Sequence, residues 1–188
     1  MSERVVVQVT GEANAGKTEL CSYFEEKYGF SVVLISDMIR SFADERGISL
    51  SAREDYLATH RQMKTEQGND VFARTVLDNP SDKLCVDGIR VINDAVRLRN
   101  TQAAASIIIA LHCPPDIRHE RSLARGSTID RSSFEKFLED DKHDAFSTDL
   151  EGPNTFAVMS AADHHIDSSM SREQVQQAAD EILLPILV

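Results

Sequence analysis

The sequence is short of positive charge and of long apolar runs. It carries 20 Lys and Arg residues against 31 Asp and Glu, which gives a net charge of −11 at pH 7. Such a surface repels polyanions, so the composition disfavours nucleic acid as the main partner, whereas a few local arginines still suit a small phosphorylated ligand. No apolar run approaches the roughly 18 to 20 residues of a membrane helix, and no signal peptide is recognisable. We therefore expect no membrane association and a cytoplasmic location.

Cysteine is also scarce, and the three cysteines show no metal-ligand spacing. Cys21, Cys85 and Cys113 lie in or beside apolar patterns, which indicates buried core residues in a reducing compartment. The chain has no internal repeat, low-complexity stretch or linker. With 188 residues, of which 41% are hydrophobic, it is predicted to be a single domain, 1–188, and we expect a monomer or homodimer.

What the sequence does contain is a complete phosphate-binding pattern. The stretch Gly11–Thr18 reads G-E-A-N-A-G-K-T, which matches G-x-x-x-x-G-K-[ST], the Walker A motif or P-loop. An apolar run of strand length precedes it and a helical pattern follows, as the motif requires. Lys17 is expected to reach the β- and γ-phosphates and the Thr18 hydroxyl to ligate Mg²⁺. The residues predicted to bind the nucleotide are Gly11, Asn14, Ala15, Gly16, Lys17 and Thr18.

Strand and helix patterns alternate along the chain, which predicts an α/β domain with a mostly parallel sheet. A helix is expected from about Met38 to Glu45, and further helical patterns run from Ser51 to Leu77. The predicted strands are Val5–Val9, Ser31–Ile35, Lys83–Val86, Ser106–Leu111 and His164–Asp167.

Two further groups of polar residues follow predicted strands, at the sheet edge where doubly wound folds bind ligands. Asp87 comes directly after an apolar strand, so it is a candidate Mg²⁺ ligand together with Thr18. Arg40 and Arg90 each stand three residues after an aspartate, Asp37 and Asp87. Because a guanidinium binds phosphate through two hydrogen bonds, this pair predicts a second phosphorylated ligand beside the P-loop.

Three arginines recur at helical spacing after the fourth predicted strand. Arg118, Arg121 and Arg125 fall on one helix face and lead into a Gly-Ser-Thr segment that ends with Asp130 and Arg131. Such a stripe is usually solvated, but here it is a candidate lid over the transferred phosphate, at about residues 126–146. Arg121 and Arg125, with Arg131, are predicted to neutralise charge in the transition state. The acidic run at 139–141 is interpreted as a solvated helix face.

The order of these motifs resembles the P-loop kinases of the adenylate kinase and dephospho-CoA kinase type. The residues that carry the resemblance are the Walker A motif, Ser36–Arg40, Asp87–Arg90 and the arginine-bearing helix after Pro114-Pro115. The sequence is most similar to an uncharacterised prokaryotic nucleotide-kinase-like group, which shares the D-G-I-R step and the pattern at Gln67–Ala73. The resemblance covers nearly the whole chain. It implies a P-loop NTPase fold like that of nucleoside monophosphate kinases, with five parallel strands and helices on both faces.

The resemblance also implies roles for individual residues. Arg40 and Arg90 hold the acceptor, a helical insertion at about residues 38–78 closes over it, and Asp37 is a candidate substrate-binding and catalytic carboxylate. The predicted function is transfer of a phosphoryl group from ATP, with Mg²⁺, to a small phosphorylated acceptor such as a nucleoside or deoxynucleoside monophosphate. Two alternatives stay open: a dephospho-CoA kinase-like enzyme that phosphorylates a hydroxyl, and a nucleotide-binding regulatory module with little turnover.

Overall fold

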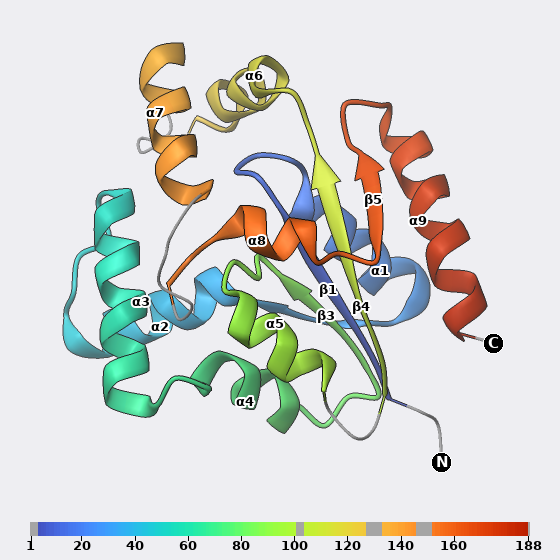
Figure 1. Ribbon diagram of the computed structural model, residues 1–188, viewed down its shortest axis with the longest axis horizontal. Coiled ribbons are helices and arrows are strands. Elements are labelled where there is room, and N and C mark those ends of the chain that lie inside the picture. The colour runs from blue at the N-terminus through green and yellow to red at the C-terminus, as the bar shows by residue number, and fades with distance from the viewer. Residues whose placement is uncertain (1–3, 101–103, 127–132, 146–151, 188) are drawn as a thin grey trace.

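The computed structural model describes residues 4–100, 104–126, 133–145 and 152–187, which form a five-stranded sheet flanked by helices (Figure 1). The strand order is β2-β3-β1-β4-β5, and all four neighbouring pairs are parallel. The predicted α/β class with a five-stranded parallel sheet is therefore confirmed. The strands are β1 (Arg4–Gly11), β2 (Ser31–Leu34), β3 (Lys83–Asp87), β4 (Ala104–His112) and β5 (His164–Asp167).

The helices connect successive strands and pack on both faces of the sheet. The helices that precede β4 in the chain are α1 (Lys17–Tyr28), α2 (Ile35–Arg46), α3 (Arg53–Gln67), α4 (Val71–Asp78) and α5 (Ile92–Arg99). Those that follow β4 are α6 (Pro115–Arg125), α7 (Phe134–Ala145), α8 (Thr155–Ser160) and α9 (Arg172–Leu187). Among the described residues, none of the helices combines the length and the apolar character needed to cross a bilayer.

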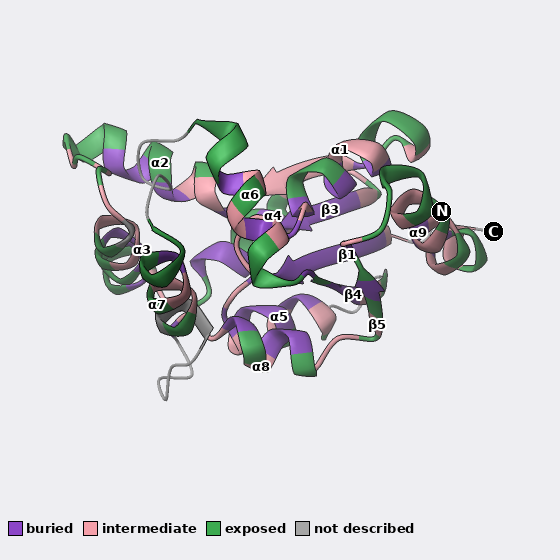
Figure 2. Cartoon of the chain, turned by 90° about the horizontal axis from the view of Figure 1, so that it is seen from above, coloured by how far each residue is buried: buried purple, intermediate pink, exposed green. Residues whose placement is uncertain are grey.

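The central strand β1 is buried on both faces, as its valine-rich sequence predicts. Val5, Val7 and Val9 point into a core formed with α1 and α9, whereas Val6 belongs to the core formed with α4, α5 and α8. Seen from above, the buried strands lie between α1 on one side and α5 with α8 on the other (Figure 2). The two apolar layers therefore fix the carboxyl end of β1, where the P-loop begins.

The segment after β2 differs from the sequence prediction. The strand ends at Leu34, and the helix begins at Ile35 instead of Met38. Ile35, Ile39 and Phe42 are all buried at i, i+4 and i+7, so the apolar residue assigned to the strand is the first contact of the helix with the core. Asp37, expected before the helix, consequently lies in its first turn, whereas Arg40 is helical as predicted.

Two further differences concern the C-terminal part of the chain. Helix α8 was not predicted; the Asn154 side chain caps it by accepting a hydrogen bond from the N–H of Ala157 at 2.9 Å. Because proline cannot donate a backbone hydrogen bond, the sequence predicts that Pro185 ends helix α9, but the helix continues to Leu187. Proline removes one backbone donor, and a position in the last turn limits that loss to a single hydrogen bond.

Candidate active site

The P-loop turns tightly between β1 and α1 because three of its residues adopt positive φ. Gly11, Asn14 and Gly16 have φ of 145°, 61° and 96°. A Cβ on Gly11 would lie 2.6 Å from the carbonyl oxygen of Leu111, so only glycine fits there. Asparagine is among the few other residues that adopt the left-handed conformation readily. The loop therefore presents the N-terminal end of α1, with its positive dipole end, to the open edge of the sheet.

The Lys17 ammonium is buried in this loop, and no carboxylate of the described residues makes an ion pair with it. It is 9% exposed, and its Nζ donates hydrogen bonds to the carbonyl oxygens of Gly11 and Glu12 at 2.9 and 2.7 Å. Burial lowers the pKa of Lys17 to about 8, and the nearby positive charge of Arg90 adds to the lowering, while Asp87 opposes it. The site thus holds a desolvated positive charge that an anionic phosphate would stabilise.

Thr18 and Asp87, the two candidate magnesium ligands, meet at the mouth of the loop. The Thr18 hydroxyl donates to Asp87 Oδ2 at 2.6 Å, and Asp87 is 7% exposed at the end of β3. Mg²⁺ prefers oxygen ligands and usually takes only one or two from the protein, completing its shell with water and phosphate oxygens. This hydroxyl and carboxylate fit such a role, and the ion would polarise the phosphate oxygens between them.

One cleft, which we call the acceptor-side cleft, opens between the P-loop, α2 and α3. It has a volume of about 410 Å³. Its cationic residues are Lys17, Arg40, Arg90 and Arg125, and its aromatic wall contains Tyr56, His60 and Phe72. The sequence prediction that the motifs after β2 and β3 converge is therefore correct for both arginines. The aromatic wall was not predicted, because nothing in its spacing distinguishes it from core residues.

Asp37 lies apart from the cleft, contrary to the expectation that it faces the acceptor. Arg40 lines the cleft and makes an ion pair with Asp37, and its Nε donates to the Tyr56 hydroxyl at 3.3 Å. The Asp37 side chain is 57% exposed and is not among the lining residues. The reason is helical geometry: Ser36, Ile39 and Arg40 share one face of α2, and position 37 is rotated about 100° away from it.

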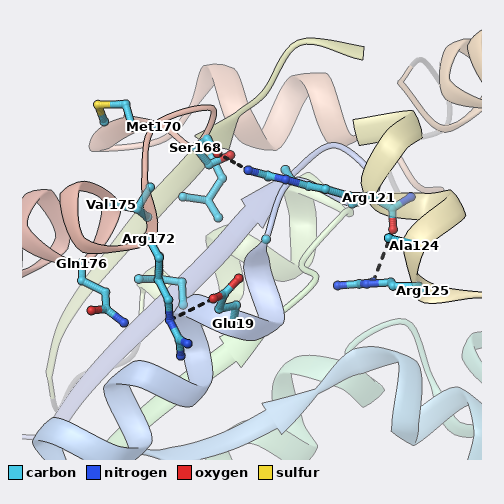
Figure 3. A pocket seen from close by; sticks show the side chains of 14 residues that line it. Glu19, Arg121, Ala124, Arg125, Ser168, Met170, Arg172, Val175 and Gln176 are labelled. Carbon is cyan, nitrogen blue, oxygen red and sulfur yellow. Dashed lines mark hydrogen bonds and ion pairs between the residues drawn. The ribbon is translucent and has the colours of Figure 1, made fainter. Parts of the chain in front are cut away.

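A second cleft, the donor-side cleft, lies on the other side of the P-loop between α1, α6 and α9 (Figure 3). It has a volume of about 290 Å³ and apolar walls formed by Leu20, Leu111, Met170 and Val175. Sequence reasoning missed Ser168, Met170 and Gln176. The available signal was their position directly after β5, whose carboxyl end lies beside that of β4 at the ligand-binding edge.

The two clefts meet at Asn14 and Arg125, which line both of them. Arg125 Nη1 donates to Asn14 Oδ1 at 3.3 Å, which places the guanidinium over the P-loop. Arg121 lines only the donor-side cleft and is held there, because its Nη2 donates to the Ser168 carbonyl at 2.7 Å. Both predicted cationic residues thus line the cleft beside α6 and α9, and Arg125 lies where the two clefts meet.

Arg118 does not join them, so the arginine stripe predicted as one lid face is split. Arg118 is 3% exposed and makes a two-pronged ion pair with Asp141 on α7, at 2.8 and 2.6 Å. It also donates to the Cys113 carbonyl, and its guanidinium lies 5.4 Å from the Phe137 ring. Asp141 is therefore an anchor for α7 instead of part of a solvated face. Arg131 lies outside the described residues.

Comparison with known proteins shows the family to which the chain belongs. The model of the AAA domain family matches residues 7–144, nearly three quarters of the chain. The chain belongs to this family. Two relatives of this AAA-domain protein are UPF0200 proteins, each 28% identical: that of Thermococcus gammatolerans covers 97% of this chain and 96% of its own, and that of Methanocaldococcus jannaschii 97% and 91%.

Solved structures of kinases share the fold. Shikimate kinase from Bacteroides thetaiotaomicron superimposes with a TM-score of 0.60 at 13% identity, covering 98% of this chain and 99% of its own. A gluconokinase from Sinorhizobium meliloti does so with 0.54 at 14% identity, covering 99% and 94%. At such identities the likeness establishes a P-loop kinase-like fold and leaves the acceptor to be proposed.

The pKa of Lys17 predicts how nucleotide affinity depends on pH. Below pH 7 the ammonium is already charged, and a bound phosphate raises its pKa from about 8. Above pH 8 the binding of Mg²⁺-ATP must be accompanied by protonation of Lys17. The dissociation constant of the nucleotide should therefore rise by about tenfold per pH unit. Calorimetry at pH 8.5 in two buffers of different ionisation enthalpy should detect this uptake. A dissociation constant that is constant from pH 7.5 to 9.5 would contradict the burial of a charged Lys17.

The split arginine stripe predicts two different phenotypes on one helix. Arg118→Met leaves the Asp141 carboxylate without its ion-pair partner. The loss should lower the free energy of unfolding by about 3 to 5 kcal/mol and the melting temperature by about 10 °C. Arg125→Ala removes an exposed side chain and should leave the melting temperature within about 2 °C. Circular dichroism melts of the two variants test this. Equal losses would show that Arg118 does not anchor α7.

Proposed function

We propose that the protein transfers a phosphoryl group from ATP, with Mg²⁺, to a small phosphorylated acceptor, a nucleoside or deoxynucleoside monophosphate. The observation that carries the proposal is the meeting of two clefts at one P-loop, where Asn14 and Arg125 line both. Hydrolysis of a nucleotide needs room for one ligand and a water molecule. Transfer needs two ligands held on either side of the moving group, which the two clefts provide.

On the donor side, Lys17 and the P-loop backbone would hold the β- and γ-phosphates. Thr18 and Asp87, already in contact at 2.6 Å, would hold Mg²⁺ against them. Arg125 lies over the loop, and its exposed guanidinium would stabilise charge that develops on the transferred group. Arg121, fixed to the backbone of Ser168, would support the donor from the other side.

On the acceptor side, Arg40 and Arg90 would hold the acceptor phosphate. They enter the cleft from different elements, α2 and the segment after β3, so their charges can converge on one group. The aromatic wall favours an acceptor that carries a ring: the His60 ring is stacked on Phe72 with 4.7 Å between centroids. A nucleoside monophosphate supplies both a phosphate and a base.

An acceptor screen with Mg²⁺-ATP, scored by ADP release, tests the proposal. With a nucleoside or deoxynucleoside monophosphate present, the protein should form ADP from ATP faster than it does without an acceptor. Arg90→Ala should lower kcat/KM for the acceptor while ATP binding is kept. ATP at a hundredfold excess over its dissociation constant should raise the free energy of unfolding by about 2.7 kcal/mol. Lys17→Ala should abolish this stabilisation. ATP stabilisation without ADP release from any acceptor would favour the regulatory module instead.

Asp37 separates the phosphate acceptor from the hydroxyl acceptor. A phosphate monoester is already anionic near neutral pH and needs no general base, whereas a hydroxyl gains roughly 10² to 10⁴ in rate from one. Because Asp37 is exposed and paired with Arg40, Asp37→Asn should reduce kcat only modestly. The measurement is steady-state kinetics on the best acceptor from the screen. A loss of three decades, with folding and ATP binding intact, would favour the hydroxyl-phosphorylating enzyme.

A further inference from the structure

The polar side chains of the donor-side cleft are nearly all engaged with one another or with backbone. Arg125 donates to Asn14, Arg172 on α9 pairs with Glu19 on α1 at 3.0 Å, Arg121 donates to the Ser168 carbonyl, and the Ser168 hydroxyl donates to the His112 carbonyl. The exception is Gln176. Within the part of the chain that the structure describes, its side-chain amide makes no hydrogen bond, although it lines the cleft.

Gln176 is held on a rigid element. It lies in the second turn of α9, next to the apolar wall residue Val175, and Figure 3 shows its amide beside Arg172 at the wall of the cleft. The following residue, Gln177, is exposed, does not line the cleft, and its amide donates to Glu181 at 3.4 Å. One helix therefore carries two adjacent glutamines, of which only the first presents an unused donor and acceptor to the cleft.

A planar amide of this kind complements a particular edge of a nucleobase. Adenine offers an amino donor next to a ring-nitrogen acceptor, and glutamine pairs with both at once. The O6–N7 edge of guanine offers two acceptors and is read by arginine or lysine instead. The leucine, valine and methionine side chains of the same cleft supply the apolar walls that the faces of a base require.

We infer that Gln176 reads the N7-bearing edge of the donor base, where adenine offers a donor beside an acceptor and guanine two acceptors, and thereby selects adenine over guanine. This inference rests on the proposed function, since it assigns the donor-side cleft to a nucleoside triphosphate. It goes further by naming the specificity-determining residue and the base. The P-loop still binds the phosphates, so removal of the amide should change which nucleotide binds without abolishing nucleotide binding.

Calorimetric titration of Mg²⁺-ATP and Mg²⁺-GTP into three proteins tests the inference: the unaltered chain, Gln176→Ala and Gln177→Ala. The unaltered chain should bind ATP at least about tenfold more tightly than GTP. Gln176→Ala should weaken ATP binding about tenfold, equivalent to about 1.4 kcal/mol, and leave GTP within about twofold. Gln177→Ala should change neither. Melting curves of both variants check that the helix is intact.

Three results would overturn the inference while leaving the proposed function in place. They are equal affinities of the unaltered chain for ATP and GTP, a Gln176→Ala variant that loses both nucleotides equally, and a Gln177→Ala variant that loses as much ATP affinity as Gln176→Ala. If neither nucleotide binds the unaltered chain at millimolar concentration, the inference and the proposed function fail together.

Discussion

A buried positive charge that makes no ion pair among the described residues is the constraint on which the rest of the site depends. The Lys17 ammonium is desolvated inside the P-loop and bonded only to two backbone carbonyls. Burial of a charged group is costly unless it is paired, so an anion that binds beside Lys17 would stabilise this arrangement. The loop follows the end of β1, which is fixed by apolar layers on both faces of the sheet. The chain as a whole carries a net charge of −11, whereas Lys17, Arg40, Arg90 and Arg125 place positive charge at the carboxyl ends of the strands.

The sequence predicted those parts of the site that depend on local backbone chemistry. The glycines of the P-loop, its lysine and threonine, and an acid directly after an apolar strand each follow from rules that operate over a few residues. The register of the parallel sheet then brings Thr18 and Asp87 together, because carboxyl ends of neighbouring parallel strands meet at one edge. The placement of Arg40 and Arg90 on one cleft follows from the same topology.

The remaining features depend on packing that spacing cannot reveal. Arg118, Arg121 and Arg125 share a helical pattern, yet the tertiary position of α7 decides that the first is buried against Asp141 while the others border a cleft. Asp37 was misplaced because a helix that starts three residues early rotates it out of the cleft. Part of the wall of the donor-side cleft comes from residues after the four-residue strand β5, whose weak pattern gave no reason to single out Gln176.

The separation of the two clefts along the chain has a consequence for how the protein can change. The acceptor-side cleft takes most of its wall from residues 35–94, and the donor-side cleft takes most of its wall from residues 111–125 and 168–176. Substitutions that share no contact partner have nearly additive effects. The residues that line one cleft can therefore change, or be redesigned, while those of the other stay the same. Among the described lining residues, only Asn14 and Arg125 belong to both clefts. Recombination at a point between β3 and β4 would therefore exchange most of the lining of one cleft and keep the phosphate-binding loop.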